Sequence, residues 1–179
     1  MSTAPAPKRA RTAPSVPISG EARGATNRVV VIDLGGDRVR AGYAGEPAPR
    51  IDACNGIGRR KGEKLLHVAD QVDKQEFVAA FNVRRPFDRG YPTDYLLQQR
   101  ILTRVMQRLC GSQDEFHQQA QSSTLLMTEP LFCLPAIQWR LDEIAFETLG
   151  FNALCRVSPA TCALRGRDVV SDDDVAEVT

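Results

Sequence analysis

The run Asp33-Leu34-Gly35-Gly36-Asp37-Arg38-Val39-Arg40 contains the residue types that bind a nucleotide phosphate. The carboxylate of Asp33, at the end of a strand, can hold a hydrated divalent ion. The backbone N–H groups of Gly35 and Gly36 can cradle phosphate oxygens, and Arg40 can neutralise them. The same run can instead be a structural turn. In that interpretation Asp33 ends a strand, and Arg38 and Arg40 lie on a solvated strand face, which is what we expect for these two arginines.

Two expected strands position this run. The β-branched residues 29–32 are typical of a strand buried on both faces. Gly35-Gly36 interrupts the strand, and glycine can adopt the positive φ of a tight hairpin turn. Residues 38–44 then alternate between apolar and polar types and predict a returning strand. A third strand is expected near Arg50 and Ile51.

The second half of the chain alternates between helix and strand patterns. A helix is expected to begin at an N-cap, Thr93 or Asp94, and to end at Gly111. A buried strand is predicted at 124–128, a helix from Pro135 to Gly150, and a strand at 153–157. This order favours an α/β fold, with parallel strands joined by right-handed crossovers and helices covering a mixed sheet.

Composition changes mark the expected domain boundaries. Residues 1–27 are rich in Ala, Pro and Arg without apolar periodicity, so we predict a disordered basic tail before an ordered domain at 28–166. Glycines and cations within 55–84 indicate a small insertion with a mobile basic loop. Everything after Arg165 reads as polar tail, with acidic residues concentrated in 167–179. In the first tail, Lys8, Arg9 and Arg11 form either a nuclear import signal or a merely solubilising cluster.

Several functional classes are disfavoured by composition. The net charge of +1 does not favour nucleic-acid binding by the whole chain. No apolar run reaches membrane-spanning length. The N-terminus lacks the apolar core of a signal peptide. Five cysteines without a CxxC motif argue against a disulfide framework or zinc site and for a reducing compartment. His67 and His117 have no metal-ligand spacing, and we expect both on the surface.

Three segments carry a family resemblance. Val31-Ile32-Asp33-Leu34-Gly35, continued by Ala41-Gly42-Tyr43-Ala44-Gly45-Glu46-Pro47, closely resembles the opening of actin and its relatives. Leu125-Leu126-Met127-Thr128-Glu129-Pro130 is similar to the actin strand that ends in Thr-Glu, and residues 143–151 are similar to the following helix. The resemblance covers about 29–166. It implies half of an actin-like ATPase domain, of the ribonuclease H-like type.

Three stretches look most like the actin-related protein 6 family: residues 69–73, 85–91 and 128–132. That resemblance implies a non-catalytic scaffold in a nuclear chromatin-remodelling complex that exchanges a variant histone into nucleosomes. Its partners would be other subunits, with the nucleosome contacted indirectly. The insertion at 55–84 lacks the loop with which actin grips its neighbour, so no filament is expected. The alternative is an ATP-binding, actin-like cytoskeletal protein. A third interpretation, nucleic-acid binding through the basic tail, fits the near-neutral domain poorly.

Departures from the family pattern bear on catalysis. The family's phosphate turn has serine where this chain has Gly36, glycine where it has Asp37, and lysine where it has Arg40. Catalytic actins carry a water-positioning glutamine in the stretch that corresponds to 157–160, and none occurs here. The second phosphate loop would lie beyond residue 166. We therefore expect that the chain has no enzymatic activity and requires no cofactor.

Two further expectations concern binding. A vestigial nucleotide site would comprise Asp33, Gly35, Gly36 and Arg40. Asp33 would hold a magnesium ion through a water molecule. We do not expect this site to bind ATP tightly. Trp139, the single tryptophan, lies on the polar side of its expected helix. It can be an anchor for a partner protein, but we expect partial burial against a neighbouring loop.

Overall fold

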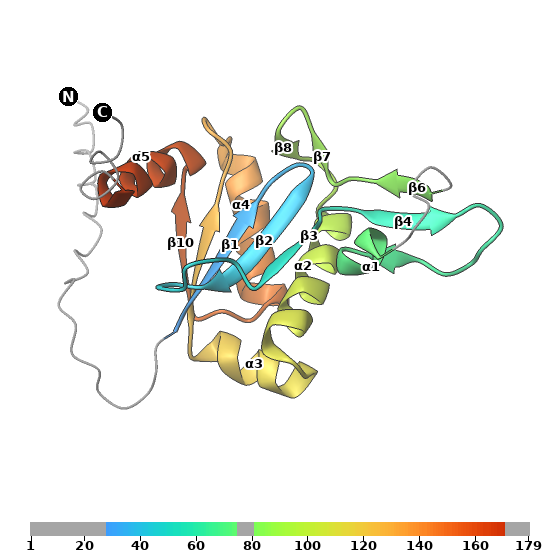
Figure 1. The fold of residues 1–179 in the computed structure, drawn as a ribbon, viewed down its shortest axis with the longest axis horizontal. Helices are drawn as coiled ribbons and strands as arrows, with labels where there is room; N and C mark the ends of the chain where they lie inside the picture. The colour runs from blue at the N-terminus through green and yellow to red at the C-terminus, as the bar shows by residue number, and fades with distance from the viewer. Residues whose placement is uncertain (1–27, 75–80, 171–179) are drawn as a thin grey trace, which may run out of the picture.

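Five strands form the main sheet of the computed structural model, which describes residues 28–74 and 81–170. The strand order is β10-β9-β1-β2-β3 (Figure 1). Strands β1, β9 and β10 are parallel to one another, whereas β2 is antiparallel to both of its neighbours, β1 and β3. The predicted α/β class with a mixed sheet is confirmed. The strands are β1 Val29–Leu34, β2 Arg38–Tyr43, β3 Ile51–Cys54, β9 Thr124–Thr128 and β10 Ala153–Val157.

Helices α2 (Tyr95–Cys110) and α4 (Pro135–Glu143) lie on the same side of the sheet (Figure 1). As predicted, Asp94 caps α2, accepting a hydrogen bond from the Leu97 N–H, and Gly111 ends it with a φ of +99°. Helix α4 continues into a π-helical turn, η2 (Ile144–Thr148), before Gly150. A π-helical turn inside a helix commonly marks a local adaptation of packing or function.

The core lies between these helices and one face of the sheet. Alternate residues of β1, namely Val30, Ile32 and Leu34, are buried there together with the apolar stripe of α2. Because side chains alternate along a strand, Val31 and Asp33 point to the opposite face, where they are only partly buried. The sheet face that carries Asp33 is therefore the more open one.

A smaller sheet, of order β5-β4-β6, occupies the predicted insertion. It comprises β4 Ile57–Arg60, β5 His67–Val68 and β6 Phe81–Arg84, with the one-turn helix α1 Asp70–Asp73 after β5. A two-stranded ribbon, β7 Phe87–Asp88 and β8 Tyr91–Pro92, leads to α2. The prediction of a basic loop was partly wrong, since Arg59 and Arg60 lie in β4.

Four further features differ from the predictions. Helix α3 (Gln113–Gln121) was not predicted, and α5 (Pro159–Val170) occupies the start of the predicted polar tail. His67 is largely buried rather than on the surface, whereas His117 is exposed. Trp139 has an exposed fraction of 75%, so the expected burial against a loop is wrong. The first tail, with Lys8, Arg9 and Arg11, lies outside the described residues, as does 171–179.

Candidate functional site

The β1–β2 turn is closed by the backbone of Gly35, whose N–H donates to the Arg38 carbonyl oxygen over 3.0 Å. A Cβ atom at position 35 would lie 2.8 Å from that oxygen, so only glycine fits. Neither Gly35 nor Gly36 has a positive φ, which makes the predicted reason for these glycines wrong. A Cβ at position 36 would meet Phe87 at an ordinary 3.6 Å. The absence of the family's serine is therefore not imposed by sterics.

A side-chain hydroxyl from β9 forms a hydrogen bond with Asp33 near the end of β1. The Thr128 hydroxyl donates to Asp33 Oδ1 over 3.0 Å and accepts the Leu34 N–H over 2.7 Å. Thr128 is buried, so its hydroxyl links two parallel strands where both end. The Asp33 side chain keeps an exposed fraction of 42%. Its second oxygen, Oδ2, lies 3.3 Å from Arg40 Nη1.

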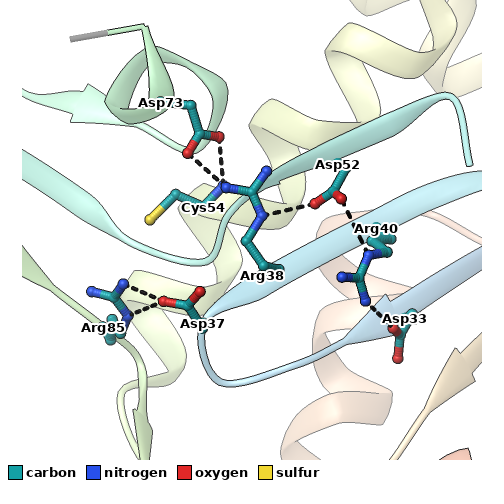
Figure 2. A network of polar contacts seen from close by, with 8 residues as sticks. All are labelled: Asp33, Asp37, Arg38, Arg40, Asp52, Cys54, Asp73 and Arg85. Carbon is teal, nitrogen blue, oxygen red and sulfur yellow. Dashed lines mark hydrogen bonds and ion pairs between the residues drawn. The ribbon is translucent and has the colours of Figure 1, made fainter. Parts of the chain in front are cut away.

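A line of alternating charges crosses the open face from Asp33 to Asp73 in α1 (Figure 2). Arg40 lies between Asp33 and Asp52, with its Nη1 and Nε each 3.3 Å from a carboxylate oxygen. Arg38 lies between Asp52 and Asp73, at 2.8 Å and 2.7 Å. Both arginines are partly exposed, as expected for a solvated strand face, and each also pairs with two carboxylates.

The line of charges joins the main sheet to the insertion. Hydrogen bonds from Arg38 and then Arg40 hold the pKa of Asp52 below its ordinary value, although desolvation acts in the opposite direction. Asp73, in α1, also accepts the Cys54 N–H through Oδ2 over 2.9 Å. An acid in α1 thus fixes both the end of β3 and an arginine of β2, two segments whose relative position shapes the turn.

Asp37 lies at the tip of the turn and pairs with Arg85, which follows β6 (Figure 2). The Arg85 Nε donates to Asp37 Oδ1 over 3.1 Å, and this hydrogen bond raises the pKa of Arg85. The carboxylate that replaces the family's glycine is consequently matched by a guanidinium from the insertion.

Beneath the turn lies a contact that sequence reasoning missed. Asn55, which is fully buried, donates through Nδ2 to the Gly35 carbonyl oxygen over 2.6 Å. Its own backbone N–H donates to the Asp37 carbonyl oxygen over 2.8 Å. Asn55 therefore supports both sides of the turn. An isolated asparagine between two short strands carries no spacing signal that would have identified this role.

The stretch 157–160 follows β10 at the same edge of the sheet. The Ser158 hydroxyl accepts the Ala160 N–H over 3.3 Å, and the Ser158 carbonyl accepts the Cys162 N–H, so Ser158 begins α5. Its polar groups are engaged in starting a helix. The stretch has no amide side chain with which to orient a water molecule.

The four predicted nucleotide-site residues, Asp33, Gly35, Gly36 and Arg40, do lie together on the β1–β2 hairpin. Together with their ion-pair neighbours they form a cluster of four carboxylates and three guanidinium groups, a local charge of −1. A phosphate entering here would meet cations already paired and an excess of negative charge. Within residues 28–74 and 81–170, no group of three or more acidic, histidine or cysteine side chains could hold a metal ion. No helix in those ranges is long and apolar enough to span a membrane.

Comparison with known proteins agrees with this architecture. The family model described as Actin matches residues 24–166. Actin-related protein 6 of Oryza sativa subsp. indica is 38% identical over 128 residues, and that of Arabidopsis thaliana is 31% identical over 140. These alignments cover 71% and 74% of this chain but only 28% and 31% of the relatives. The chain thus spans less than a third of the length of these relatives. By sequence and by fold, the chain belongs to the actin family.

Proposed function

We propose that this chain acts as a non-catalytic scaffold in a nuclear chromatin-remodelling complex that exchanges a variant histone, and that it folds without help from nucleotide. The names of its relatives support the actin-related part of this proposal. The observation that carries the non-catalytic part is the placement of Arg40 between Asp33 and Asp52. The cation that would meet a phosphate is occupied by carboxylates of the chain itself.

The charges around the β1–β2 turn also support a non-catalytic function. Phosphoryl transfer depends on positioned groups that stabilise the charge at the terminal phosphate. Gly36 offers no hydroxyl there, and Asp37 offers a carboxylate whose charge Arg85 balances. Binding a phosphate would require Arg40 to exchange its two carboxylates for phosphate oxygens. The line of charges from Asp33 to Asp73 instead connects the main sheet to the insertion.

Calorimetric titration of the chain with Mg·ATP tests the proposal. We expect no binding in the micromolar range, and no sedimenting filament in a pelleting assay. A matched variant, Gly36→Ser with Asp37→Gly, restores the family's residues at two positions and reports whether the turn alone limits binding. Sub-micromolar affinity of the unchanged chain for Mg·ATP would contradict the scaffold proposal and support an ATPase.

Nuclear location is a separate part of the proposal. It depends on Lys8, Arg9 and Arg11, a basic cluster in a Pro/Ala-rich segment. Residues 1–27 fused to a fluorescent reporter should concentrate it in the nucleus, and replacement of the three cations by alanine should abolish that concentration. An even distribution of the unchanged fusion would show that the cluster only solubilises the chain.

One observation favours the alternative, an ATP-binding, actin-like cytoskeletal protein. Asp33 remains partly open to solvent beside a turn that only glycine can form, and position 36 has room for a serine side chain. The same calorimetric and pelleting experiments separate the two functions. Binding accompanied by filaments would favour the cytoskeletal protein, whereas absence of both would favour the scaffold.

A further inference from the structure

The turn between β4 and β5 projects away from the main sheet, toward the right of Figure 1. The end of β4 and this turn together have four exposed cations within six residues: Arg59, Arg60, Lys61 and Lys64. Glu63 is the single acid among them and lies 3.6 Å from Arg60. Among the described residues, the other three cations have no carboxylate within ion-pair distance. The projection therefore has a local charge of +3 that the described part of the molecule does not neutralise.

Two leucines follow the cations directly. Leu65 has an exposed fraction of 66% and Leu66 of 47%. The base of the projection is firmly held, because Ile57 and Gly58 pair with Val68 and His67 and the Ala69 N–H donates to the Gly56 carbonyl oxygen. The leucines thus lie at the exposed end of a structured hairpin. Large apolar side chains grouped on a surface often indicate a binding site.

We propose that this hairpin, residues 57–68, docks an acidic segment of a partner protein that also carries apolar side chains. The cations would pair with the segment's carboxylates and the leucines would be covered by its apolar groups. Charge complementarity provides orientation and association rate, while the apolar contact provides the buried centre of an interface. The inference rests on the proposed scaffold function and names the chemistry of one partner.

Nucleic acid is the competing ligand for a basic hairpin, and the structure favours it less. A phosphate backbone would match the charge of Arg59, Lys61 and Lys64 but would leave both leucines uncovered. Alternation along β4 also sends Arg59 and Arg60 to opposite faces of the small sheet. The cations are consequently spread around the hairpin and do not form the single stripe that would follow a duplex groove.

Fluorescence anisotropy with labelled probes tests the docking. The probes are a short synthetic peptide of glutamates and leucines, the same peptide with every leucine changed to serine, and a short DNA duplex. We expect the chain to bind the first peptide, to bind the serine peptide several-fold more weakly, and to bind the duplex most weakly. Equal affinity for the two peptides, or preference for the duplex, would overturn the proposal.

Variants of the chain locate the binding. The pair Arg59→Glu and Lys61→Glu should weaken binding of the leucine peptide roughly tenfold, and Leu65→Ser with Leu66→Ser should weaken it several-fold. The matched control is Arg89→Glu with Arg165→Glu, two exposed arginines elsewhere that change the net charge equally. Unaltered affinity in both hairpin variants, or equal loss in the control, would contradict the assignment.

The outcome is separable from that of the proposed function. All variants should keep the thermal transition of the unchanged chain, since each substituted side chain is exposed. Peptide docking together with tight Mg·ATP binding would contradict only the nucleotide-independent scaffold. Absence of docking together with absence of Mg·ATP binding would contradict only the hairpin assignment.

Discussion

Asn55 and Gln98 exchange side-chain hydrogen bonds in the core, over 3.3 Å from Asn55 Nδ2 to Gln98 Oε1 and 3.2 Å from Gln98 Nε2 to Asn55 Oδ1. Both side chains are fully buried. Because Asn55 also donates to the Gly35 carbonyl oxygen, the pair connects α2 to the β1–β2 turn. The turn is therefore supported from below by amides and on the open face by ion pairs.

The first prediction concerns Gln98→Leu. The substitution preserves approximate volume but leaves part of the Asn55 amide buried without a partner, which typically costs about 1–3 kcal/mol. We expect the free energy of unfolding in urea to fall by about 2 kcal/mol. Gln118→Leu, at an exposed position of α3, is the matched control and should change stability little. A Gln98→Leu chain as stable as the parent would show that the amide pair contributes nothing.

Elements with a repeating pattern were predictable, and contacts between distant segments were not. Helix α2 has Leu97, Ile101 and Val105 at helical spacing between an Asp94 cap and Gly111, and its bounds were predicted closely. Strand β9 was predicted at its observed bounds because its apolar run ends at Glu129-Pro130. Helix α3 was missed although Ser112 and Glu115 form a capping box, because its only apolar residues, Phe116 and Ala120, are too few to form a clear periodic pattern, even though both are buried.

The site was predicted only in part, because its local elements follow from the sequence and its long-range contacts do not. The short run of sequence around the turn was enough to place Asp33, Gly35, Gly36 and Arg40 on one hairpin. Predicting a hairpin requires only a strand, a turn and a returning strand. The partners of Arg38 lie 14 and 35 residues further along, at Asp52 and Asp73. Such pairs follow from how the insertion folds against the sheet. Neither spacing nor composition specifies that arrangement.

The second prediction contrasts the two glycines of the turn. Gly35→Ala would place a Cβ atom 2.8 Å from the backbone oxygen of Arg38, a contact that only a backbone shift relieves. We expect a loss of about 2 kcal/mol or more. Gly36→Ala meets only Phe87, at 3.6 Å, and should be neutral or raise stability by about 0.4–1 kcal/mol. Thermal unfolding of both variants provides the measurement, and equal effects would contradict the turn geometry.

The third prediction is a pH dependence at Asp70, which has an exposed fraction of only 16%. Burial acts to raise its pKa, but the hydrogen bond and charge of Arg104, aided by Arg108 and Lys74, outweigh burial and lower it. The Arg104 Nε lies 2.9 Å from Asp70 Oδ1. With the folded pKa below the unfolded value of about 3.9, the stabilisation is fully present above that value. It is lost as pH falls through the folded pKa.

Asp70→Asn removes this contribution. At neutral pH the free energy of unfolding should fall by about 1–2 kcal/mol, and the difference from the parent chain should shrink steadily below about pH 4. Asp88→Asn, at an exposed position of the β7–β8 ribbon, is the control and should follow the parent curve. A gap between Asp70→Asn and the parent that stays constant down to the lowest pH would disprove the linkage.

The last prediction tests the hydroxyl that joins β1 to β9. Thr128→Val keeps the shape of the side chain but removes the acceptor of the Leu34 N–H and the donor to Asp33, so stability should fall by about 2 kcal/mol. Thr128→Ser keeps both hydrogen bonds and loses one buried methyl group, which costs about 1 kcal/mol. Total stability separates these variants poorly, whereas hydrogen exchange at the Leu34 amide separates them well. Exchange there should accelerate, relative to the Ile32 amide, in Thr128→Val and not in Thr128→Ser. The same rate in both variants would mean that the Thr128 hydroxyl does not hold the end of β1, and that Asp33 is positioned by Arg40 alone.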